Sequence, residues 1–515
     1  MVRNIRFGGA SARSGAAVRA GLRGAVTAAV LCGLLALGGC SAVGGEAATE
    51  SSAAEGSSGE SAADTSSTAV DVSAMDLEFT DRDLDASYDA ASATSIALSD
   101  AASTVTGAGA SVDGSTVTIS QAGVYVLSGA LSDGRIVVEA TDQDKIQLVF
   151  DGVSVHSGDD PAVYVKQANK VFVTLAEGTS NTLSDSATYT LEEGTDEPNA
   201  ALFSKDDLTI NGTGSLEVAG SYAHAVNSKD DLVITGGTLT VTAVEDGLRG
   251  RDCVKIAGGT FDVTAGDAIK SSNDEDGTRG FVLIGDGSFS ITAGDDAVHA
   301  ESALFVNGGQ VEVALCVEGL EAEQIYMNDG DVYVTSSDDA VNAAARGSST
   351  PDAVGAAGGG EPGDGAVGGE IPEGGLSRPE GDPGASGGAA GDGVPGEGGG
   401  QAAPSGDGAA SVADAPAAAD AASGAPISTG GAAAGGFPTA SSSSSCLIQI
   451  NGGRLVLDAG GDGLDSNGSI EITGGVVLVQ GPSSDDDAAL DYETTAEISG
   501  GTVVMVGSAG MAEGF

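Results

Sequence analysis

An acidic residue that precedes Gly or Ala and then an aliphatic residue recurs along the chain. The recurrences are Asp246, Asp267, Asp296, Glu318, Asp339 and Asp462. If these segments stack on one another, the carboxylates lie close together, and like charges repel or raise each other's pKa unless a cation or hydrogen bonds compensate. Ca²⁺ takes about six to eight oxygen ligands, carboxylates among them. Turn capping is the alternative, because Asp side chains commonly accept backbone N–H bonds in turns.

Asp465 stands three positions after Asp462 and adds a second carboxylate to the same turn. This is the best single pair of metal ligands in the chain. We therefore expect a calcium ladder, with turn capping left open as the alternative. The candidate metal ligands are Asp246, Asp267, Asp296, Asp339, Asp462 and Asp465.

A second set of residues aligns in the same way and is basic. Lys205, Lys229 and Arg251 each precede an Asp residue. Three cations in register would clamp the carboxylates of a polyuronate chain, which makes these residues candidate ligand-binding groups. A salt ladder between each base and its neighbouring Asp is the alternative.

A third column follows the acid by three positions. It consists of Asn227, Arg249, Lys270, His299, Glu321, Asn342 and Asp465. β-Elimination of a uronate needs a metal to acidify the proton beside the carboxylate and a base to remove that proton. Lys270 would be this base if the protein were a lyase, and a solvated Lys on an exposed turn is the alternative. The three histidines are scattered, so no other catalytic set is predicted.

A glycine-turn motif sets the period of the chain. An aliphatic residue, a polar or small residue and two glycines precede a strand of alternating aliphatics, as in Ile234-Thr235-Gly236-Gly237-Thr238-Leu239-Thr240-Val241. Clear copies begin at Ile256, Val306, Ile450, Ile472 and Ile498, and looser copies at Ile210, Ile284 and Met327. Successive copies start 21 to 28 residues apart, except for the 123 residues from Met327 to Ile450. Removing the 99 residues of 347–445 leaves 24, so the period survives.

Each period of about 22 residues holds three short strands, which is typical of one coil of a parallel β-helix, where equivalent residues stack ~4.8 Å apart. Strands of a β-sandwich are typically longer and need no strict period. We therefore predict an all-β fold, a single-stranded parallel β-helix. Cys253 and Cys446 would lie about four coils apart, roughly 19 Å, too far for a disulfide with its Cα separation of ~5.5 Å. Apart from Cys32 and Cys40 near the N-terminus, the chain has three cysteines, these two and Cys316, and an odd number cannot all pair.

The N-terminus indicates export. Five arginines and no acid precede an apolar run from Ala25 to Leu37, which ends in Leu37-Gly38-Gly39-Cys40. The run has the length of a signal peptide core and is too short to span a bilayer. Small residues directly before a Cys resemble a bacterial lipobox, so we expect cleavage before Cys40 and lipidation of Cys40, with a plain secretory signal as the alternative. The protein would then be lipid-anchored to the bacterial membrane and face outside.

Composition divides the chain into segments. Ser, Ala, Glu and Gly dominate the stretch after Cys40, and Gly, Ala, Pro, Ser and Asp dominate 347–445, so neither can pack a core. The expected segments are a signal peptide (1–39), a disordered acidic stalk (40–74), a β-rich cap region (75–145), the first part of the β-helix (146–346), a disordered insertion (347–445) and the C-terminal coils (446–515).

The charge restricts the partners. The chain has 75 Asp and Glu against 20 Lys and Arg, a net charge of -55, which excludes nucleic acid because phosphate binding needs clustered cations. The chain has no Trp and 8 Tyr, so the aromatic platforms usual for neutral sugars are scarce. An acidic polysaccharide bound through Ca²⁺ fits better, since an anionic protein would bind an anionic ligand very weakly without the cation.

Several motifs resemble a known family. They are Ser228-Lys229-Asp230-Asp231-Leu232-Val233-Ile234-Thr235-Gly236-Gly237, Gly461-Asp462-Gly463-Leu464-Asp465-Ser466-Asn467-Gly468 and Gly507-Ser508-Ala509-Gly510-Met511-Ala512-Glu513. They are similar to the bacterial carbohydrate-binding domain of parallel β-helix type, related in shape to pectate lyases and found on exported lipoproteins. The resemblance covers about 146–515 apart from the insertion. It implies calcium-bearing coils and binding of plant-type polysaccharides such as polygalacturonate, without established catalysis.

Two departures from the family stand out. The insertion is unusually long, and the chain stops at Phe515 where relatives tend to continue, so we expect the last coil to lack its cap. The predicted function is a monomeric surface lipoprotein that binds acidic polysaccharide, with cellulose as a second ligand, and does so without catalysis. A calcium-dependent lyase and an adhesin for a non-glycan partner are the alternatives.

Overall fold

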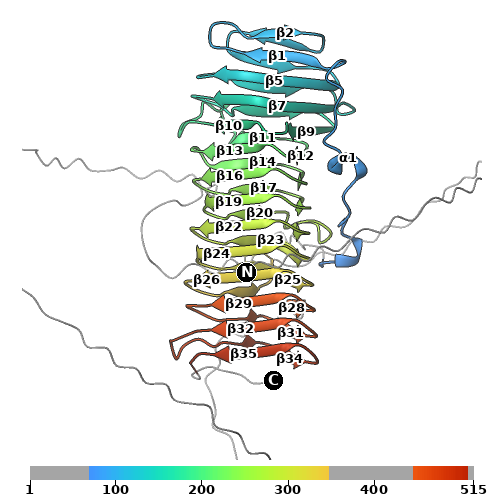
Figure 1. Ribbon diagram of the computed structural model, residues 1–515. Helices are drawn as coiled ribbons and strands as arrows, with labels where there is room; N and C mark the ends of the chain where they lie inside the picture. Colours follow the sequence, from blue (N-terminus) through green and yellow to red (C-terminus); the bar gives the residue numbers. More distant parts are fainter. Residues whose placement is uncertain (1–68, 347–444, 509–515) are drawn as a thin grey trace, which may run out of the picture. The chain divides into compact units, whose positions relative to one another are not determined.

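The computed structural model describes residues 69–346 and 445–508, and Figure 1 shows them as one stack of short strands. The predicted signal peptide, the lipidation site Cys40, most of the predicted stalk and almost all of the predicted insertion lie outside the described residues. Residues 509–515, which carry most of the closing motif, lie outside them as well. Within the described ranges, no helix is long and apolar enough to cross a membrane.

The stack is a parallel β-helix, as predicted. One coil consists of β14 (His224–Ser228), β15 (Asp231–Ile234) and β16 (Thr238–Ala243). The next coil repeats this path with β17 (Leu248–Gly250), β18 (Cys253–Ile256) and β19 (Thr260–Ala265). Each strand pairs in parallel with its equivalent one coil further on. Equivalent residues of successive repeats therefore lie side by side.

Three parallel sheets run along the stack. Besides β14 and β17, the first sheet contains β8 (Val163–Gln167), β11 (Ala200–Ser204), β20 (Ile269–Ser271), β27 (Val341–Ala343), β30 (Asp465–Ser466) and β33 (Asp491–Tyr492). Besides β15 and β18, the second contains β9 (Lys170–Leu175), β12 (Asp207–Gly212), β21 (Phe281–Ile284), β28 (Leu447–Ile450), β31 (Ser469–Ile472) and β34 (Thr495–Ile498). Two long strands, β23 (Val298–Val306) and β25 (Leu320–Met327), contribute to both of these sheets.

The third sheet follows the glycine turns. Besides β16 and β19, it contains β10 (Ser180–Ser184), β13 (Ser215–Gly220), β22 (Ser288–Ala293), β24 (Gln310–Cys316), β26 (Asp331–Ser336), β29 (Arg454–Asp458), β32 (Val476–Gln480) and β35 (Thr502–Val506). Gly237 has φ +102, and a Cβ there would lie 2.8 Å from the Leu175 side chain. Only glycine adopts this conformation without strain, which explains the repeated glycine before each strand of this sheet.

The core fills the space between the three sheets. Alternate residues of each strand point inward, as Leu239 and Val241 do on β16, both with 0% exposure. Equivalent inward residues stack along the axis, and the rings of Phe261 and Phe289 lie parallel with centroids 4.5 Å apart. Cys253, Cys316 and Cys446 are buried, and no disulfide joins the described coils.

The N-terminal strands close one end of the stack. They are β1 (Thr94–Leu98), β2 (Thr104–Thr106), β3 (Ala110–Asp113), β4 (Thr116–Ile119), β5 (Gly123–Leu131), β6 (Arg135–Glu139) and β7 (Lys145–His156). β1 pairs antiparallel with β2, and β3 with β4. The pairings of β5 with β7 and of β6 with β8 are already parallel. Parallel stacking thus reaches into the region that the sequence predicted as a separate cap.

A segment without the repeat period lies along the second sheet. Residues 69–93, here called the N-terminal strap, contain the short helices η1 (Val72–Ala74) and α1 (Asp81–Leu84) and run along the side of the stack in Figure 1. Met75 packs on Phe281 and Phe305, two outer residues of the second sheet. The Lys255 ammonium, 4% exposed, donates to the backbone carbonyls of Asp76 at 3.1 Å and Glu78 at 2.9 Å. The strap thereby covers apolar side chains and a cation that would otherwise face water.

Asp83 fixes the strap to the coils. Its carboxylate lies 2.9 Å from the Lys170 ammonium and accepts a hydrogen bond of 2.7 Å from the Thr209 hydroxyl. Burial alone would raise the pKa of Asp83, but the hydrogen bonds from Lys170, Thr80 and Thr209 outweigh it and lower the pKa to about 2. This carboxylate therefore stabilises the fold above its ordinary pKa of 3.8, and the contribution is lost as the pH falls through about 2.

Replacing Asp83 by Ala should loosen the strap. The change leaves the Lys170 ammonium, 12% exposed, without its carboxylate partner, and removing one partner of a buried ion pair costs about 3–5 kcal/mol. We expect the Asp83→Ala variant to lose free energy of unfolding in urea at pH 7 and to exchange amide hydrogens faster in residues 69–93. Glu78→Ala, which removes an exposed carboxylate from the same strap, should change stability by less than about 0.5 kcal/mol. Equal losses in the two variants would contradict this account.

Candidate functional site

The outer face of the first sheet carries the predicted third column in register. Arg249 pairs with Lys270, Lys270 with His299 and His299 with Glu321 on successive strands. The column continues through Asn342 to Asp465. Backbone hydrogen bonds align the preceding turns in the same way, from Gly319 N–H to the Asp339 carbonyl and from Ala340 N–H to the Asp462 carbonyl. The predicted acid column and the third column therefore run side by side along one face, which we call the charged face.

At the N-terminal coils, each acid of the charged face has a basic partner. Asp246 Oδ2 lies 2.8 Å from Arg249 Nη1, and Asp267 Oδ2 lies 2.6 Å from Lys270 Nζ. All four groups are mostly shielded, since the carboxylates are 7% and 5% exposed and the two cations 28% and 25%. A basic residue three positions after the acid thus neutralises the repulsion between stacked carboxylates, and these coils need no metal for that purpose.

The same contact decides how Lys270 can act. Burial alone would lower the pKa of Lys270, but the carboxylates of Asp267 and Asp246 outweigh burial and raise it well above its ordinary value. A general base must be unprotonated before it accepts a proton, and its pKa is best near the working pH. The arrangement holds Lys270 as an ammonium ion, which opposes its predicted role as the base of a lyase.

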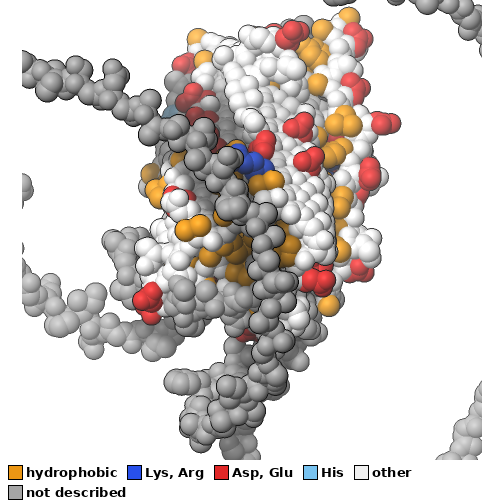
Figure 2. Space-filling view, turned by 60° about the horizontal axis from the view of Figure 1, so that its bottom comes forward, with side chains coloured by type: hydrophobic (Ala, Val, Ile, Leu, Met, Phe, Trp, Pro, Cys, Tyr) orange, Lys and Arg blue, Asp and Glu red, His pale blue; other side chains and the backbone are white. Residues whose placement is uncertain are grey.

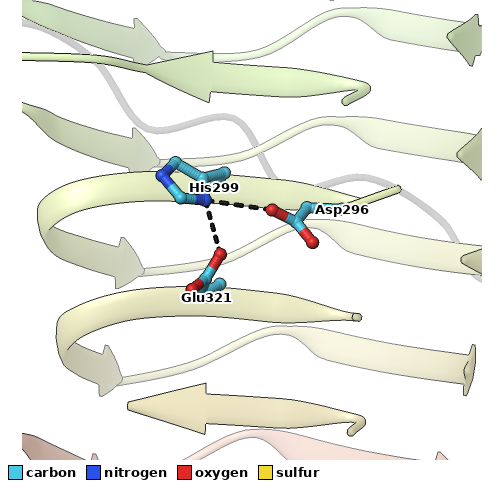
Figure 3. A group of neighbouring side chains, drawn as sticks. All are labelled: Asp296, His299 and Glu321. Atoms are coloured by element: carbon cyan, nitrogen blue, oxygen red, sulfur yellow. Dashed lines mark hydrogen bonds and ion pairs between the residues drawn. The ribbon is translucent and has the colours of Figure 1, made fainter. Parts of the chain in front are cut away.

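The middle of the charged face is a cluster around His299, shown in Figure 3. His299 Nδ1 lies 2.6 Å from Glu321 Oε2 and 3.0 Å from Asp296 Oδ2. Its Nε2 lies 3.6 Å from Glu301 Oε1 and is buried without a hydrogen-bond partner. Burial disfavours the imidazolium, yet the three carboxylates outweigh it and raise the pKa of His299 well above its ordinary value. His299 is therefore the last cation of the column in the C-terminal direction.

The carboxylates of this cluster respond in opposite directions. Burial raises the pKa of Asp296, and the charges of Asp267 and Glu321 add to that effect. Burial would also raise the pKa of Glu321, but its hydrogen bond with His299 lowers it. His299 Nδ1 is shared between the carboxylates of Asp296 and Glu321. Of these two carboxylates, Asp296 takes up a proton more readily.

At the C-terminal coils, the charged face has acids without basic partners. Oxygens of Asp339, Asp462 and Asp465 all lie within 4.8 Å of one another. In the described part of the chain, no Lys, Arg or His forms an ion pair with any of the three. Burial is the main cause that raises the pKa of Asp339 to about 7, of Asp462 to about 6 and of Asp465 to about 8, and neighbouring carboxylates add to it. Three carboxylates are thus held together without an ion-pair partner among the described residues.

An amide residue is the register neighbour of one of these carboxylates. Asn342, 8% exposed, is the register partner of Asp465, and its Oδ1 is buried without a hydrogen-bond partner. Its Nδ2 donates to Glu318 Oε2 at 2.9 Å. Carboxylate and amide oxygens are the ligands that Ca²⁺ prefers, so these residues fit the predicted ion. Asn342 was not among the predicted metal ligands. Its position three residues after Asp339, in the third column, is the sequence signal that could have identified it.

Turn capping, the alternative interpretation of the acids, is also present. Asp267 Oδ1 accepts from Asp296 N–H at 3.0 Å, and Asp339 Oδ1 accepts from Asp462 N–H at 2.6 Å. Because a carboxylate has two oxygens, one can cap the next coil while the other contacts a side chain or an ion. The two interpretations are therefore compatible in the same residue.

The predicted ligand-binding bases lie apart from the charged face. Lys205, Lys229 and Arg251 follow the first sheet on successive coils, aligned by bonds from Lys229 N–H to the Ser204 carbonyl and from Arg251 N–H to the Ser228 carbonyl. The Lys229 ammonium pairs with Glu197, and Arg251 Nη2 lies 3.0 Å from Glu275 Oε2. Lys205 is exposed. Loop acids thus contact two of the three cations, and Arg251 Nη1 also lies 3.6 Å from Oδ1 of the neighbouring Asp252, the kind of partner that the sequence suggested.

Stability should depend on the charge of Asp465. Because its folded pKa is raised to about 8, the folded chain binds more protons than the unfolded chain between about pH 4 and pH 8, and stability falls as the pH rises through this range. In a chelator, we expect Asp465→Asn to reduce the drop in melting temperature from pH 5 to pH 8 by at least about 2–4 °C. The control is Asp458→Asn, which removes an exposed acid of the third sheet. Parallel pH curves for wild type and Asp465→Asn would refute the proposed repulsion.

Comparisons with known proteins address the family. A family model described as carbohydrate-binding domain-containing protein matches residues 113–358. A carbohydrate-binding domain-containing protein of Acetivibrio thermocellus is 39% identical over 136 residues, which are 26% of this chain and 48% of that protein. This chain thus spans about half the length of that relative. A solved polysaccharide lyase-like protein from C. thermocellum, studied as a gadolinium derivative, is 36% identical and covers 43% of this chain and 91% of its own, with a TM-score of 0.42. The resemblance inferred from the sequence is confirmed, because residues 113–358 match the family of carbohydrate-binding domain-containing proteins.

Proposed function

We propose that the protein binds acidic polysaccharide on the charged face, through Ca²⁺ held by Asp339, Asp462 and Asp465. The observation that carries this proposal is the group of three carboxylates within 4.8 Å that has no basic partner among the described residues. Asn342, the register neighbour of Asp465, has a buried oxygen without a hydrogen-bond partner, which would supply a neutral ligand. The match to a carbohydrate-binding family supports a glycan as the partner.

The charge of the protein explains why the ion would matter. With a net charge of -55, the surface repels a polyuronate, and Figure 2 shows many acidic side chains and few basic ones on the face in view. A divalent cation supplies positive charge that both the protein and a uronate carboxylate can share. Toward the N-terminal coils, Arg249, Lys270 and His299 place partly exposed cations on the same face. Because these cations are paired with acids of the same face, a chain of uronates would meet less repulsion there and would meet positive charge at the ion.

Export and the absence of catalysis are parts of the same proposal. The arginine-rich start, the apolar run and the Cys at position 40 support a lipid-anchored protein that faces outside. A binding role without catalysis is supported by the ammonium state of Lys270, because the base predicted for a lyase is held in its protonated form. Calcium-dependent lyase activity and adhesion to a non-glycan partner are the outcomes against which this proposal is tested.

Retention on insoluble polygalacturonate, with and without EDTA, tests the proposal. Wild type should be retained in Ca²⁺ and released by EDTA, with no rise in the absorbance of unsaturated uronate. Asp339→Asn with Asp465→Asn should weaken binding in Ca²⁺ by at least about tenfold, which corresponds to roughly 1.4 kcal/mol. The matched control is Glu312→Gln, an exposed acid of the third sheet, which should bind like wild type.

The other outcomes separate the alternatives. A rise in absorbance would identify a lyase and refute the binding role without catalysis. Retention that EDTA leaves unchanged would refute the role of the ion. No retention in either buffer would refute binding of acidic glycan and favour the adhesin.

A further inference from the structure

The outer face of the third sheet presents a regular array of hydroxyl groups. On β16, β19 and β22, nine exposed outward positions form three rows and three columns, and eight of them are Thr or Ser. The rows, here called the hydroxyl array, are Thr238, Thr240 and Thr242; Thr260, Asp262 and Thr264; Ser288, Ser290 and Thr292. Strand geometry spaces these side chains about 4.8 Å apart between coils and roughly 6.6 Å apart along each strand.

The eight hydroxyls are free to bind something outside the protein. Among the described residues, none of them makes a side-chain hydrogen bond, whereas Ser215 on the adjacent β13 donates to the Thr179 carbonyl at 3.3 Å. Each hydroxyl offers one donor and two acceptor positions. The middle column of the array is bounded by Glu217 on one side and Glu312 on the other, whereas the first column continues to Ser215 and Gln310.

The array rests on a rigid base. Directly beneath it, Leu239, Phe261 and Phe289 point inward with at most 3% exposure, and the two rings stack at 4.5 Å. Strands of the same length in unbroken register form its surface, with pairings that run from Thr238 through Thr260 to Ser288. A partner that fits this face must therefore be flat and regular as well.

The charge of the array indicates the charge of its partner. Asp262 is the one ionisable residue among the nine, in a chain with a net charge of -55. A polyanion would gain no ion pair here, and a polycation would be attracted to the carboxylates of the charged face. Figure 2 shows broad areas of the surface that are neither charged nor hydrophobic, between separate acidic side chains. An uncharged, hydroxyl-rich partner is the complementary one.

We propose that the hydroxyl array is a second binding surface, which docks on the ordered face of an uncharged polysaccharide without calcium. One hydrogen bond contributes little to affinity, so a single soluble sugar would be held poorly, whereas an ordered solid engages many hydroxyls at once. The inference rests on the proposed function only for the class of ligand. The surface and its independence from calcium are new, whereas cellulose was already predicted from the sequence as a second ligand.

Retention on microcrystalline cellulose in EDTA tests this inference. Thr240→Lys with Ser290→Lys places two long, hydrated side chains on either side of Asp262, whose charge compensates them within the column. We expect this double variant to bind cellulose at least about tenfold more weakly, a loss equal to roughly two hydrogen bonds. Thr335→Lys, at an exposed position of the same sheet two coils away, should bind like wild type. Thr240→Ser with Thr264→Ser keeps the hydroxyls and should bind like wild type too.

The outcomes separate this inference from the proposed function. Asp339→Asn with Asp465→Asn should keep its cellulose binding in EDTA while losing polygalacturonate in Ca²⁺. Wild type that fails to bind cellulose in EDTA, or a Lys double variant that binds as well as wild type, would overturn the hydroxyl array and leave calcium-dependent binding untouched. Thermal unfolding of each variant shows whether a loss of binding comes from the surface or from the fold.

Discussion

Parallel stacking in register is the constraint on which the rest of this structure depends. Every outward residue lies about 4.8 Å from its equivalents on the neighbouring coils, so any residue type that the repeat conserves becomes a column. A column of Leu or Phe is favourable because it builds the core. A column of Asp is unfavourable unless each carboxylate is compensated. The charged face shows how the compensation differs from coil to coil, since the position three residues after the acid is Arg249, then Lys270, then His299, and beyond them acidic or amide.

The repeat made the coils and the columns predictable from the sequence. A slip by one residue would turn every inward side chain outward, so the aliphatic alternation of the segment at Ile234 and of its copies fixes the register. That register alone implied that Lys270 neighbours His299 and that Asn342 neighbours Asp465. The sequence could not show which oxygen of each acid caps a turn, because both interpretations use the same carboxylate.

The aperiodic parts were beyond such reasoning. The strap has no repeat, and its main contact joins Asp83 to Lys170, residues far apart in sequence that no pattern connects. Two partners of the basic column likewise come from distant loops, Glu197 for Lys229 and Glu275 for Arg251, whereas the contact of Arg251 with its neighbour Asp252 could be predicted. The unpartnered Asn342 oxygen is visible only when the neighbours of every buried atom are known. Repetition thus makes a solenoid easy to predict along its coils and difficult to predict where loops cross them.

The strap also determines which faces remain for large ligands. It covers the outer apolar residues of the second sheet around Phe281 and Phe305, and leaves the charged face and the hydroxyl array uncovered by itself. Those two faces lie on different sheets of the same stack of coils and share the same strand spacing, but they differ in the residue types at their outward positions. In a solenoid each coil contacts only its neighbours, so the outward residues of one sheet can change with little effect on another. The same regular spacing of coils can therefore support two surfaces, one charged and one nearly uncharged, whose binding energies are nearly independent of each other.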